Sequence, residues 1–278
     1  TGNWRPATGD PAPSLPTMND LELAVLAART GGALVRDGFD RGVVPEYKRR
    51  FDPVTETDRA SEAAILKLLT EHRPGDAILA EESGGTIPDG RLWIIDPLDG
   101  TVNFVHGIPQ VSVSVGLWEG STPLAGAIYD PLRDECFAAA VGQGATLNDQ
   151  PISVSSISNL DRSVAATGFP YDHGEYADEY AAVVGAVLAS VNGIRRIGSA
   201  ALDFAWVAAG RYEAYWELHL EPWDQAAGIL IVREAGGRVT DMSDVDSVPA
   251  TPLVLASNTA VHEDLRTIVE PLVPDRLR

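Results

Sequence analysis

Apolar residues recur every three or four positions in the first part of the chain that looks folded. From Asp20 to about Asp37 this spacing predicts a helix with one buried face. Asn19 precedes it and is a favourable helix cap. A second helix is predicted from about Asp58 to His72, with Thr57 before it. Three apolar residues would form its buried face: Ile65, Leu68 and Leu69.

The middle of the chain changes to short apolar runs. These runs are separated by Gly, Pro and Asp, which is typical of β-strands joined by turns. The middle is therefore predicted to be mostly β. The predicted strands are Ala77–Ala80, Leu92–Ile95, Val111–Trp118, Leu124–Tyr129 and Cys136–Val141.

After about residue 160, strand-like and helix-like segments alternate. Such alternation favours an α/β layer in the second half of the chain. In chain order the predicted elements are a strand Val164–Thr167, a helix near Glu175–Val191, a helix Ala200–Ala209, a strand Ala214–Glu217 and a helix from about Asp224 to Ala235.

The beginning of the chain differs in composition from the rest. Residues 1–17 are rich in Pro, Gly and Thr, and we interpret them as a disordered tail or a remnant of expression cloning. We therefore expect one catalytic domain over residues 18–278. Its two halves, about 18–155 and 156–278, would share one cleft.

Composition excludes several classes of protein. Of the 278 residues, 45% are hydrophobic and 22% are charged, as in ordinary globular proteins. The net charge of −19 argues against nucleic-acid binding. The single Cys136 cannot form an intramolecular disulfide, and no apolar run reaches the roughly 18 residues of a membrane span. Neither a signal peptide nor a membrane partner is expected, so the predicted location is the cytoplasm.

Candidate chemistry begins in residues 92–101, LWIIDPLDGT, where an apolar strand runs into two aspartates. Pro97 favours a turn, and Gly100 permits an unusual backbone angle. Asp96 and Asp99 could then face a common centre, with the carbonyl oxygen of Leu98 between them. Hard divalent cations prefer such all-oxygen sites. An ordinary turn would have the same residues, so this motif alone leaves both interpretations open.

Three further segments carry acidic residues beside apolar elements. Glu81 and Glu82 follow a strand in AEESGG, and they could instead be surface residues. Asp224 begins an apolar helix in EPWDQAAGILIVREAGG, and Asp58 precedes a helix in DPVTETD. Either aspartate could be a plain helix cap.

Together these segments resemble the inositol monophosphatase family of lithium-sensitive phosphatases, over about Asp20 to Glu270. WIIDPLDGTVNFVHGIP is similar to the family's Asp-Pro-Ile-Asp-Gly-Thr motif, with Leu98 in place of Ile. PWDQAAGILIVREAGG is similar to its second signature, and RRIGSAALD and YEAYWE also resemble family segments. The resemblance implies a layered α/β fold, an αβαβα sandwich. In it, an antiparallel sheet packed by helices faces a mixed sheet.

The resemblance also implies roles for individual residues. Two magnesium ions would be bridged by Asp96, and a third would bind more weakly. Manganese or calcium could take their place in crystals. The implied metal ligands are Glu81, Asp96, the carbonyl oxygen of Leu98, Asp99 and Asp224.

A water molecule activated by the metals would hydrolyse the phosphate ester directly, and family members of this kind act on small phosphorylated metabolites. The implied catalytic residues that handle this water are Glu81, Thr101 and Asp58. The implied substrate-binding residues are Gly100, Thr101, Gly198, Ser199, Ala200 and Glu217, the last of which would contact hydroxyl groups of a polyol.

Several alternatives stay open at this point. The substrate could be inositol monophosphate or a similar sugar phosphate, but also histidinol phosphate, fructose 1,6-bisphosphate, a phosphoadenosine nucleotide or NADP. The chain could instead be a regulatory binding protein in transcription or RNA maturation. The resemblance further implies a homodimer. One departure concerns the family lysine eleven residues before Asp58, where this chain has Tyr47 followed by Lys48.

Overall fold

Two helices, each with one buried face, begin the part of the chain that the computed structural model describes, which is residues 18–170, 174 and 176–273. Helix α1 spans Asp20–Arg41, and the side chain of Asn19 accepts the N–H of Glu22, as predicted for its cap. Helix α2 spans Glu56–His72. The tail proposed for residues 1–17 lies outside the described residues.

Helix α2 begins two residues earlier than the sequence predicts. Thr55, not Thr57, is the cap, because its hydroxyl accepts the N–H of Thr57. Asp58 completes a capping box from inside the helix, with its carboxylate accepting the Thr55 N–H at 2.9 Å. Asp58 is thus fixed in place by the helix start.

A seven-stranded sheet contains the five strands predicted for the middle of the chain. Two further strands, β8 and β9, were not predicted, and they have only three residues each. Neighbouring strands are antiparallel except β3 and β4, which are parallel, so the expected purely antiparallel sheet is wrong at that edge. In sheet order the strands are β3 (Ala77–Ala80), β4 (Arg91–Asp99), β5 (Ser112–Glu119), β6 (Thr122–Asp130), β7 (Glu135–Ala140), β8 (Ala145–Leu147) and β9 (Gln150–Ile152).

A five-stranded mixed sheet forms from the second half of the chain. Strands β10 and β12 lie where the sequence predicts them, whereas β11, β13 and β14 were not predicted. Strand β10 pairs in parallel with β11 and β12, and β14 pairs antiparallel with β12 and β13. In sheet order the strands are β11 (Gly193–Arg195), β10 (Val164–Thr167), β12 (Ala214–Leu218), β14 (Leu253–Ser257) and β13 (Arg238–Thr240).

The remaining helices include two with altered ends. Helix α6 begins at Pro222 rather than Asp224, because Glu221 is its cap and a proline fits the first helical turn. Helix α4 is shorter than predicted, and position 175 lies outside the described residues. The other bounds are α3 (Thr101–Val105), α4 (Ala177–Leu188), α5 (Ala200–Ala208), α6 (Pro222–Glu234), α7 (His262–Val269) and the 3₁₀ turns Leu160–Arg162 and Glu270–Leu272.

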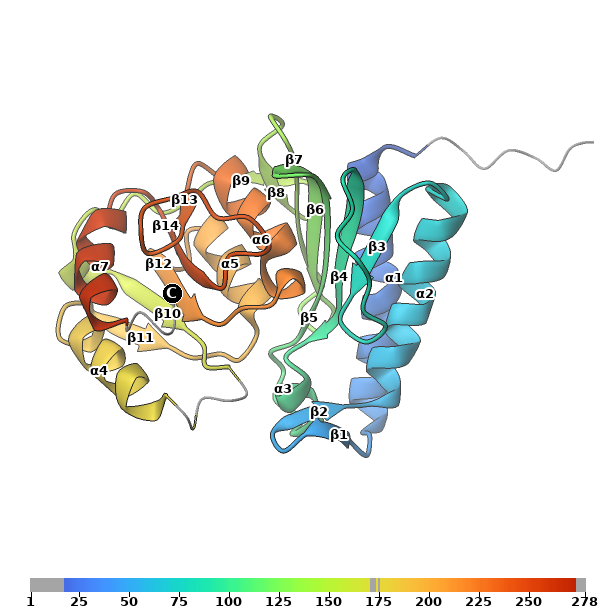
Figure 1. Ribbon diagram of the computed structural model, residues 1–278, viewed down its shortest axis with the longest axis horizontal. Coiled ribbons are helices and arrows are strands. Elements are labelled where there is room, and N and C mark those ends of the chain that lie inside the picture. Colours follow the sequence, from blue (N-terminus) through green and yellow to red (C-terminus); the bar gives the residue numbers. More distant parts are fainter. Residues whose placement is uncertain (1–17, 171–173, 175, 274–278) are drawn as a thin grey trace, which may run out of the picture.

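These elements stack in five layers, and the predicted αβαβα order is confirmed (Figure 1). Helices α1 and α2 cover one face of the seven-stranded sheet. Helices α5 and α6 lie between the two sheets, and α4 and α7 cover the outer face of the five-stranded sheet (Figure 1). A small hairpin, β1 (Glu46–Arg49) with β2 (Asp52–Val54), lies beside α3.

Helix α6 approaches the seven-stranded sheet very closely. A Cβ atom on Gly116 of β5 would lie 2.9 Å from atoms of Ala226, and one on Gly126 of β6 would lie 3.1 Å from Ala227. A side chain at Gly116 would force the backbone of α6 to move, and one at Gly126 would require Ala227 to shift slightly. The close approach fixes the start of α6, and with it Asp224, against the sheet that carries Asp96.

None of the helices in the described ranges combines the length and apolarity that crossing a membrane requires.

Candidate active site

The two aspartates of the DPLDGT segment lie where β4 ends. Pairing between β4 and β5 is irregular between Asp96 and Asp99, so both side chains leave the regular ladder at this point. Their exposed fractions are only 2% and 7%. The N–H of Leu98 donates to Oδ1 of Asp96 at 3.0 Å, and Gly100 has a left-handed φ of 92°. The tight turn predicted from Pro97 and Gly100 is present.

Asp58 and Thr101 come together from α2 and α3. The Thr101 hydroxyl lies 3.1 Å from Oδ1 of Asp58 and 3.0 Å from the carbonyl oxygen of Leu98, so its proton has two acceptors. The Thr55 hydroxyl donates to the other Asp58 oxygen at 2.6 Å. Burial raises the pKa of Asp58, while these hydrogen bonds oppose the rise. The predicted contact between Thr101 and Asp58 is therefore present.

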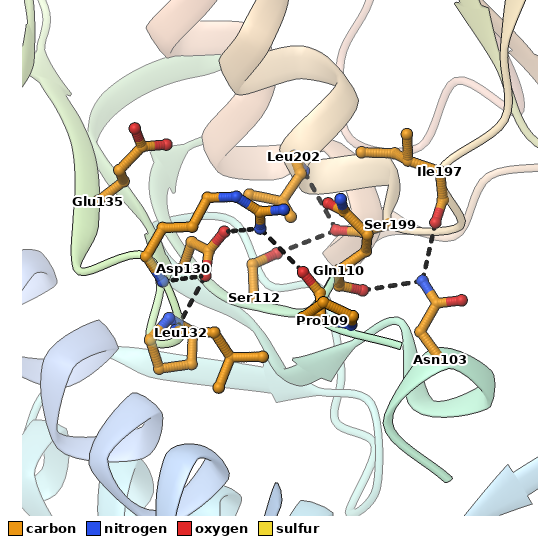
Figure 2. A network of polar contacts seen from close by, with 12 residues as sticks. Asn103, Pro109, Gln110, Ser112, Asp130, Leu132, Glu135, Ile197, Ser199 and Leu202 are labelled. Atoms are coloured by element: carbon orange, nitrogen blue, oxygen red, sulfur yellow. Dashed lines mark hydrogen bonds and ion pairs between the residues drawn. The ribbon is translucent and has the colours of Figure 1, made fainter. Parts of the chain in front are cut away.

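Asp99 joins the first half of the chain to the loop before α5. Its carboxylate accepts hydrogen bonds from the hydroxyls of Ser112 and Ser199. It also accepts the N–H groups of Ala200 at 3.2 Å and Ala201 at 2.9 Å. Figure 2 shows the hydroxyl groups of Ser112 and Ser199 side by side, 3.2 Å apart. Two residues of the predicted substrate loop thus directly hold a predicted metal ligand.

Glu81 follows β3 and lies next to an unforeseen partner. Nζ of Lys48, on hairpin β1–β2, donates to Oε1 of Glu81 at 2.9 Å and to Oε1 of Glu82 at 2.5 Å. Burial raises the pKa of Glu81 to about 7, although Lys48 opposes the rise. The sequence signal for Lys48 was its place next to the expected family position, Tyr47.

Electrostatic repulsion links the predicted acidic ligands, most clearly at Asp96. Burial raises the pKa of Asp96 well above its ordinary value, and the charges of Glu81, Asp99 and Asp224 raise it further. Burial and the charge of Asp99 likewise raise the pKa of Asp224. Four carboxyl groups from β4, α6 and the end of β3 therefore share one poorly solvated region.

Asp224 also takes part in capping α6, which was one of the two interpretations of the sequence, although the cap residue itself is Glu221 and Asp224 completes the capping box from inside the helix. Its Oδ2 accepts the N–H of Glu221 at 2.8 Å at the start of α6. The capping hydrogen bond uses only one carboxylate oxygen of Asp224. Asp224 can therefore take part in the helix cap and still lie close to the other carboxylates. The two interpretations are compatible.

Glu217 lies on β12, on the five-stranded sheet, with 8% of its surface exposed. The Tyr215 hydroxyl donates to its carboxylate at 2.5 Å, and burial raises the pKa of Glu217 to about 7. The charge of Asp99 acts on Glu217, so Glu217 belongs to the same region as the metal-ligand candidates. A Cβ on Gly168 would lie 2.0 Å from this carboxylate, so any side chain at this position would displace it.

The donor types fit a hard divalent cation, since they are carboxylates and one peptide carbonyl. The excess of negative charge around Asp96 also favours the binding of a cation. In the described residues, however, no three acidic, His or Cys side chains are arranged as a ready metal site. Glu81, Asp99 and Asp224 are instead turned to Lys48, the α5 loop and Glu221. The metal-ligand set stays a prediction.

Comparison with known proteins identifies the family. The sequence model of the Inositol monophosphatase family matches residues 18–273. The chain belongs to the inositol monophosphatase family. Members of this family are metal-dependent, and the assignment supports a phosphatase activity.

Individual relatives within the inositol monophosphatase family carry two kinds of name. An inositol-1-monophosphatase of Synechocystis sp. is 44% identical over 250 residues, which is 88% of this chain and 86% of the relative. Nus factor SuhB of Escherichia coli is 40% identical over 264 residues, covering 93% of this chain and 98% of the relative. The structure of an inositol monophosphatase from Anabaena superposes with a TM-score of 0.83 at 41% identity, covering 92% of this chain and 97% of that structure.

Proposed function

We propose that this protein is a magnesium-dependent phosphomonoesterase that hydrolyses inositol monophosphate or a similar small polyol phosphate. The observation that carries the proposal is the buried turn at the end of β4, where Asp96 and Asp99 are only 2% and 7% exposed and the charges of Glu81 and Asp224 act on Asp96. Two buried and two partly buried carboxyl groups that act on one another are unfavourable unless cations neutralise them. We further propose two or three magnesium ions per subunit, a homodimer and a cytoplasmic location.

The proposed ligands divide between two magnesium ions. Glu81, Asp96 and the Leu98 carbonyl would hold one, and Asp96, Asp99 and Asp224 the other. When bound, such ions activate water and stabilise negative charge on a phosphate undergoing in-line displacement.

Thr101 and Asp58 supply the protein's part in handling the proton. If the Thr101 proton points to Oδ1 of Asp58, the lone pairs of Oγ1 are free to accept a proton from a neighbouring water. Asp58 can accept the threonine proton in turn, because burial raises its pKa. Glu81 is the second proposed acceptor of this proton, and in the metal-free protein burial raises its pKa.

Substrate recognition would come from two sides of the site. The N–H groups of Gly100 and Thr101 are proposed to hold the phosphate. Glu217 and the loop of Gly198, Ser199 and Ala200 are proposed to hold the hydroxyl groups. A buried carboxylate that keeps accepting capacity beside Tyr215 suits donors such as polyol hydroxyls.

The test is phosphate release from a panel of substrates, each with and without magnesium. The panel contains inositol monophosphate, histidinol phosphate, fructose 1,6-bisphosphate, 3′-phosphoadenosine 5′-phosphate and NADP. We expect magnesium-dependent turnover with inositol monophosphate or another polyol monophosphate fastest. Rapid turnover of histidinol phosphate with none of inositol monophosphate would overturn the polyol assignment.

A regulatory role is a second candidate, because relatives from Escherichia coli and Pseudomonas aeruginosa are named Nus factor SuhB. With a net charge of −19, such a role would act through protein contacts rather than through direct nucleic-acid binding. The substitution Asp96→Asn separates the two candidates. A cellular role that survives this change while phosphate release is lost would favour the regulatory function.

A further inference from the structure

Asn103 joins two loops that belong to different sheets. It lies on α3, two residues after Thr101, and only 6% of it is exposed. Its Nδ2 group donates to the carbonyl oxygens of Gln110 and Ile197, each at 2.8 Å (Figure 2). The same group lies 3.2 Å from the carbonyl oxygen of Gly198. One amide group thus satisfies carbonyls from both loops.

The two loops approach each other through glycine. Gly100 and Gly198 both have left-handed backbones, with φ of 92° and 84°. A Cβ on Gly100 would lie 2.8 Å from the Gln110 oxygen and 3.1 Å from the Gly198 oxygen. A Cβ on Gly198 would lie 2.9 Å from Nδ2 of Asn103. The backbones of the two loops therefore approach each other directly, and the Asn103 amide lies between them.

Without the amide, this contact would be unfavourable. Carbonyl oxygens repel one another, and buried carbonyls that lose their donor carry a desolvation penalty. Asn103 supplies two N–H donors from one planar group, so it both links and spaces the carbonyls. No other residue in the network of Figure 2 donates to both Gln110 and Ile197.

We infer that Asn103 is a positioning residue that sets the spacing between the turn at Gly100–Thr101 and the loop Gly198–Ala200. The inference rests on the proposed function, in which the turn holds the phosphate and the loop holds the substrate hydroxyls. A substrate that spans both parts needs them at a fixed separation. A phosphate ester without hydroxyl groups needs only the turn.

The test compares kcat/KM for inositol monophosphate with kcat/KM for phenyl phosphate, which has no hydroxyl groups outside its phosphate. Asn103→Ala should lower the ratio of the two values by about tenfold or more, because small displacements of substrate-positioning groups strongly affect rate. Asn103→Asp keeps the side-chain volume but replaces the donor by an acceptor. This variant should lower the ratio at least as much. It provides the test if the alanine variant folds poorly.

Asn258 provides a matched control in the same chain. It is similarly buried, at 5% exposed, and its Nδ2 donates to the carbonyl oxygen of Ile157 at 2.7 Å. Asn258→Ala removes a comparable hydrogen bond that makes no contact with either loop. It should change kcat/KM for both substrates by the same factor and so leave the ratio at the wild-type value.

A ratio that is unchanged in both Asn103 variants would overturn the inference. Hydrogen exchange of the peptide that spans residues 195–203 gives a second readout that does not depend on turnover. Exchange should become faster in the Asn103 variants and stay unchanged in Asn258→Ala; equal exchange in all of them would also overturn the inference. A wild-type protein without magnesium-dependent turnover would instead contradict the proposed function, while the exchange result would still decide the role of Asn103.

Discussion

The ammonium group of Lys48 donates to Oε1 of Glu81 at 2.9 Å. Lys48 lies on the hairpin β1–β2, whereas Glu81 follows β3 of the seven-stranded sheet. A positive charge from a separate two-stranded element therefore neutralises a carboxylate that is proposed to bind magnesium. Lys48 and the metal ion would compete for the same oxygen.

Removing the lysine charge should tighten magnesium binding. In Lys48→Met, Glu81 loses its competing cation, and we expect the dissociation constant for magnesium to fall several-fold. Isothermal titration calorimetry with magnesium measures this directly. Lys67→Met, which changes an exposed lysine on α2, should leave the constant unchanged. Weaker binding in Lys48→Met would mean that Lys48 supports the metal site instead of competing for it.

Glu217 should make stability depend on pH. Burial raises its pKa from 4.5 to about 7, so between these values the folded protein holds the proton more tightly than the unfolded chain. Stability then falls as the pH rises through this window, by roughly 3 kcal/mol when complete. Glu217→Gln removes the titrating group. We compare the two proteins in a buffer that contains a metal chelator. Between pH 5 and 8, the melting temperature of Glu217→Gln should fall by several degrees less than that of the wild type.

The Tyr215 hydroxyl gives this prediction a second test. Its hydrogen bond stabilises the charged form of Glu217 and so opposes the rise in pKa. Tyr215→Phe should therefore extend the loss of stability to higher pH. Identical pH profiles for the wild type, Glu217→Gln and Tyr215→Phe would show that Glu217 does not titrate in this range.

The sequence was most informative where a motif and an element end coincide. Asp96 and Asp99 follow a long apolar strand, and Pro97 and Gly100 fix the turn, so local residues are sufficient to predict it. The start of α2 was misplaced because Thr55 and Thr57 are both good caps, and only the capping box with Asp58 distinguishes them. Strands of three residues are too short to show an alternating pattern.

The contact between Thr101 and Asp58 was expected from the family resemblance, but other long-range polar contacts were not predicted. Lys48 reaches Glu81 across 33 positions, and Asn103 reaches Ile197 across 94. Asn103 does not differ locally from an ordinary helix asparagine, and the only sequence signal for Lys48 was its place next to the family lysine position, which did not indicate its contact with Glu81. Their roles depend on how the two sheets and the hairpin are placed together, which no local pattern encodes.

Asp96→Asn should have opposite effects on activity and on metal-free stability. Phosphate release should fall by about a thousandfold or more, because the proposed bridging ligand is lost. In a chelator at pH 8 the melting temperature should rise, because the change removes a buried carboxyl that Glu81, Asp99 and Asp224 repel. Differential scanning fluorimetry measures this melting temperature in the chelator and, for comparison, in magnesium. A lower melting temperature in the chelator would contradict the repulsion.

Asp130 is the matched control for Asp96. It is also fully buried, but its carboxylate is paired with Arg133 at 2.6 Å and accepts two backbone N–H groups. Asp130→Asn should lower the melting temperature both with and without magnesium, because it leaves the arginine without its partner charge. Comparing the two variants distinguishes a buried carboxylate paired with an arginine, Asp130, from one repelled by other carboxylates, Asp96.

Thr101 allows the proton-handling proposal to be tested without changing a proposed metal-ligand side chain. Thr101→Val keeps the shape of the side chain but removes the hydroxyl that lies 3.1 Å from Asp58, whereas Thr101→Ser keeps that hydroxyl. At saturating magnesium, kcat should fall about 10²- to 10⁴-fold in the valine variant and much less in the serine variant. Calorimetry should find similar magnesium affinity in both. Equal kcat in the two variants would contradict the proposed role of the Thr101 hydroxyl in proton handling.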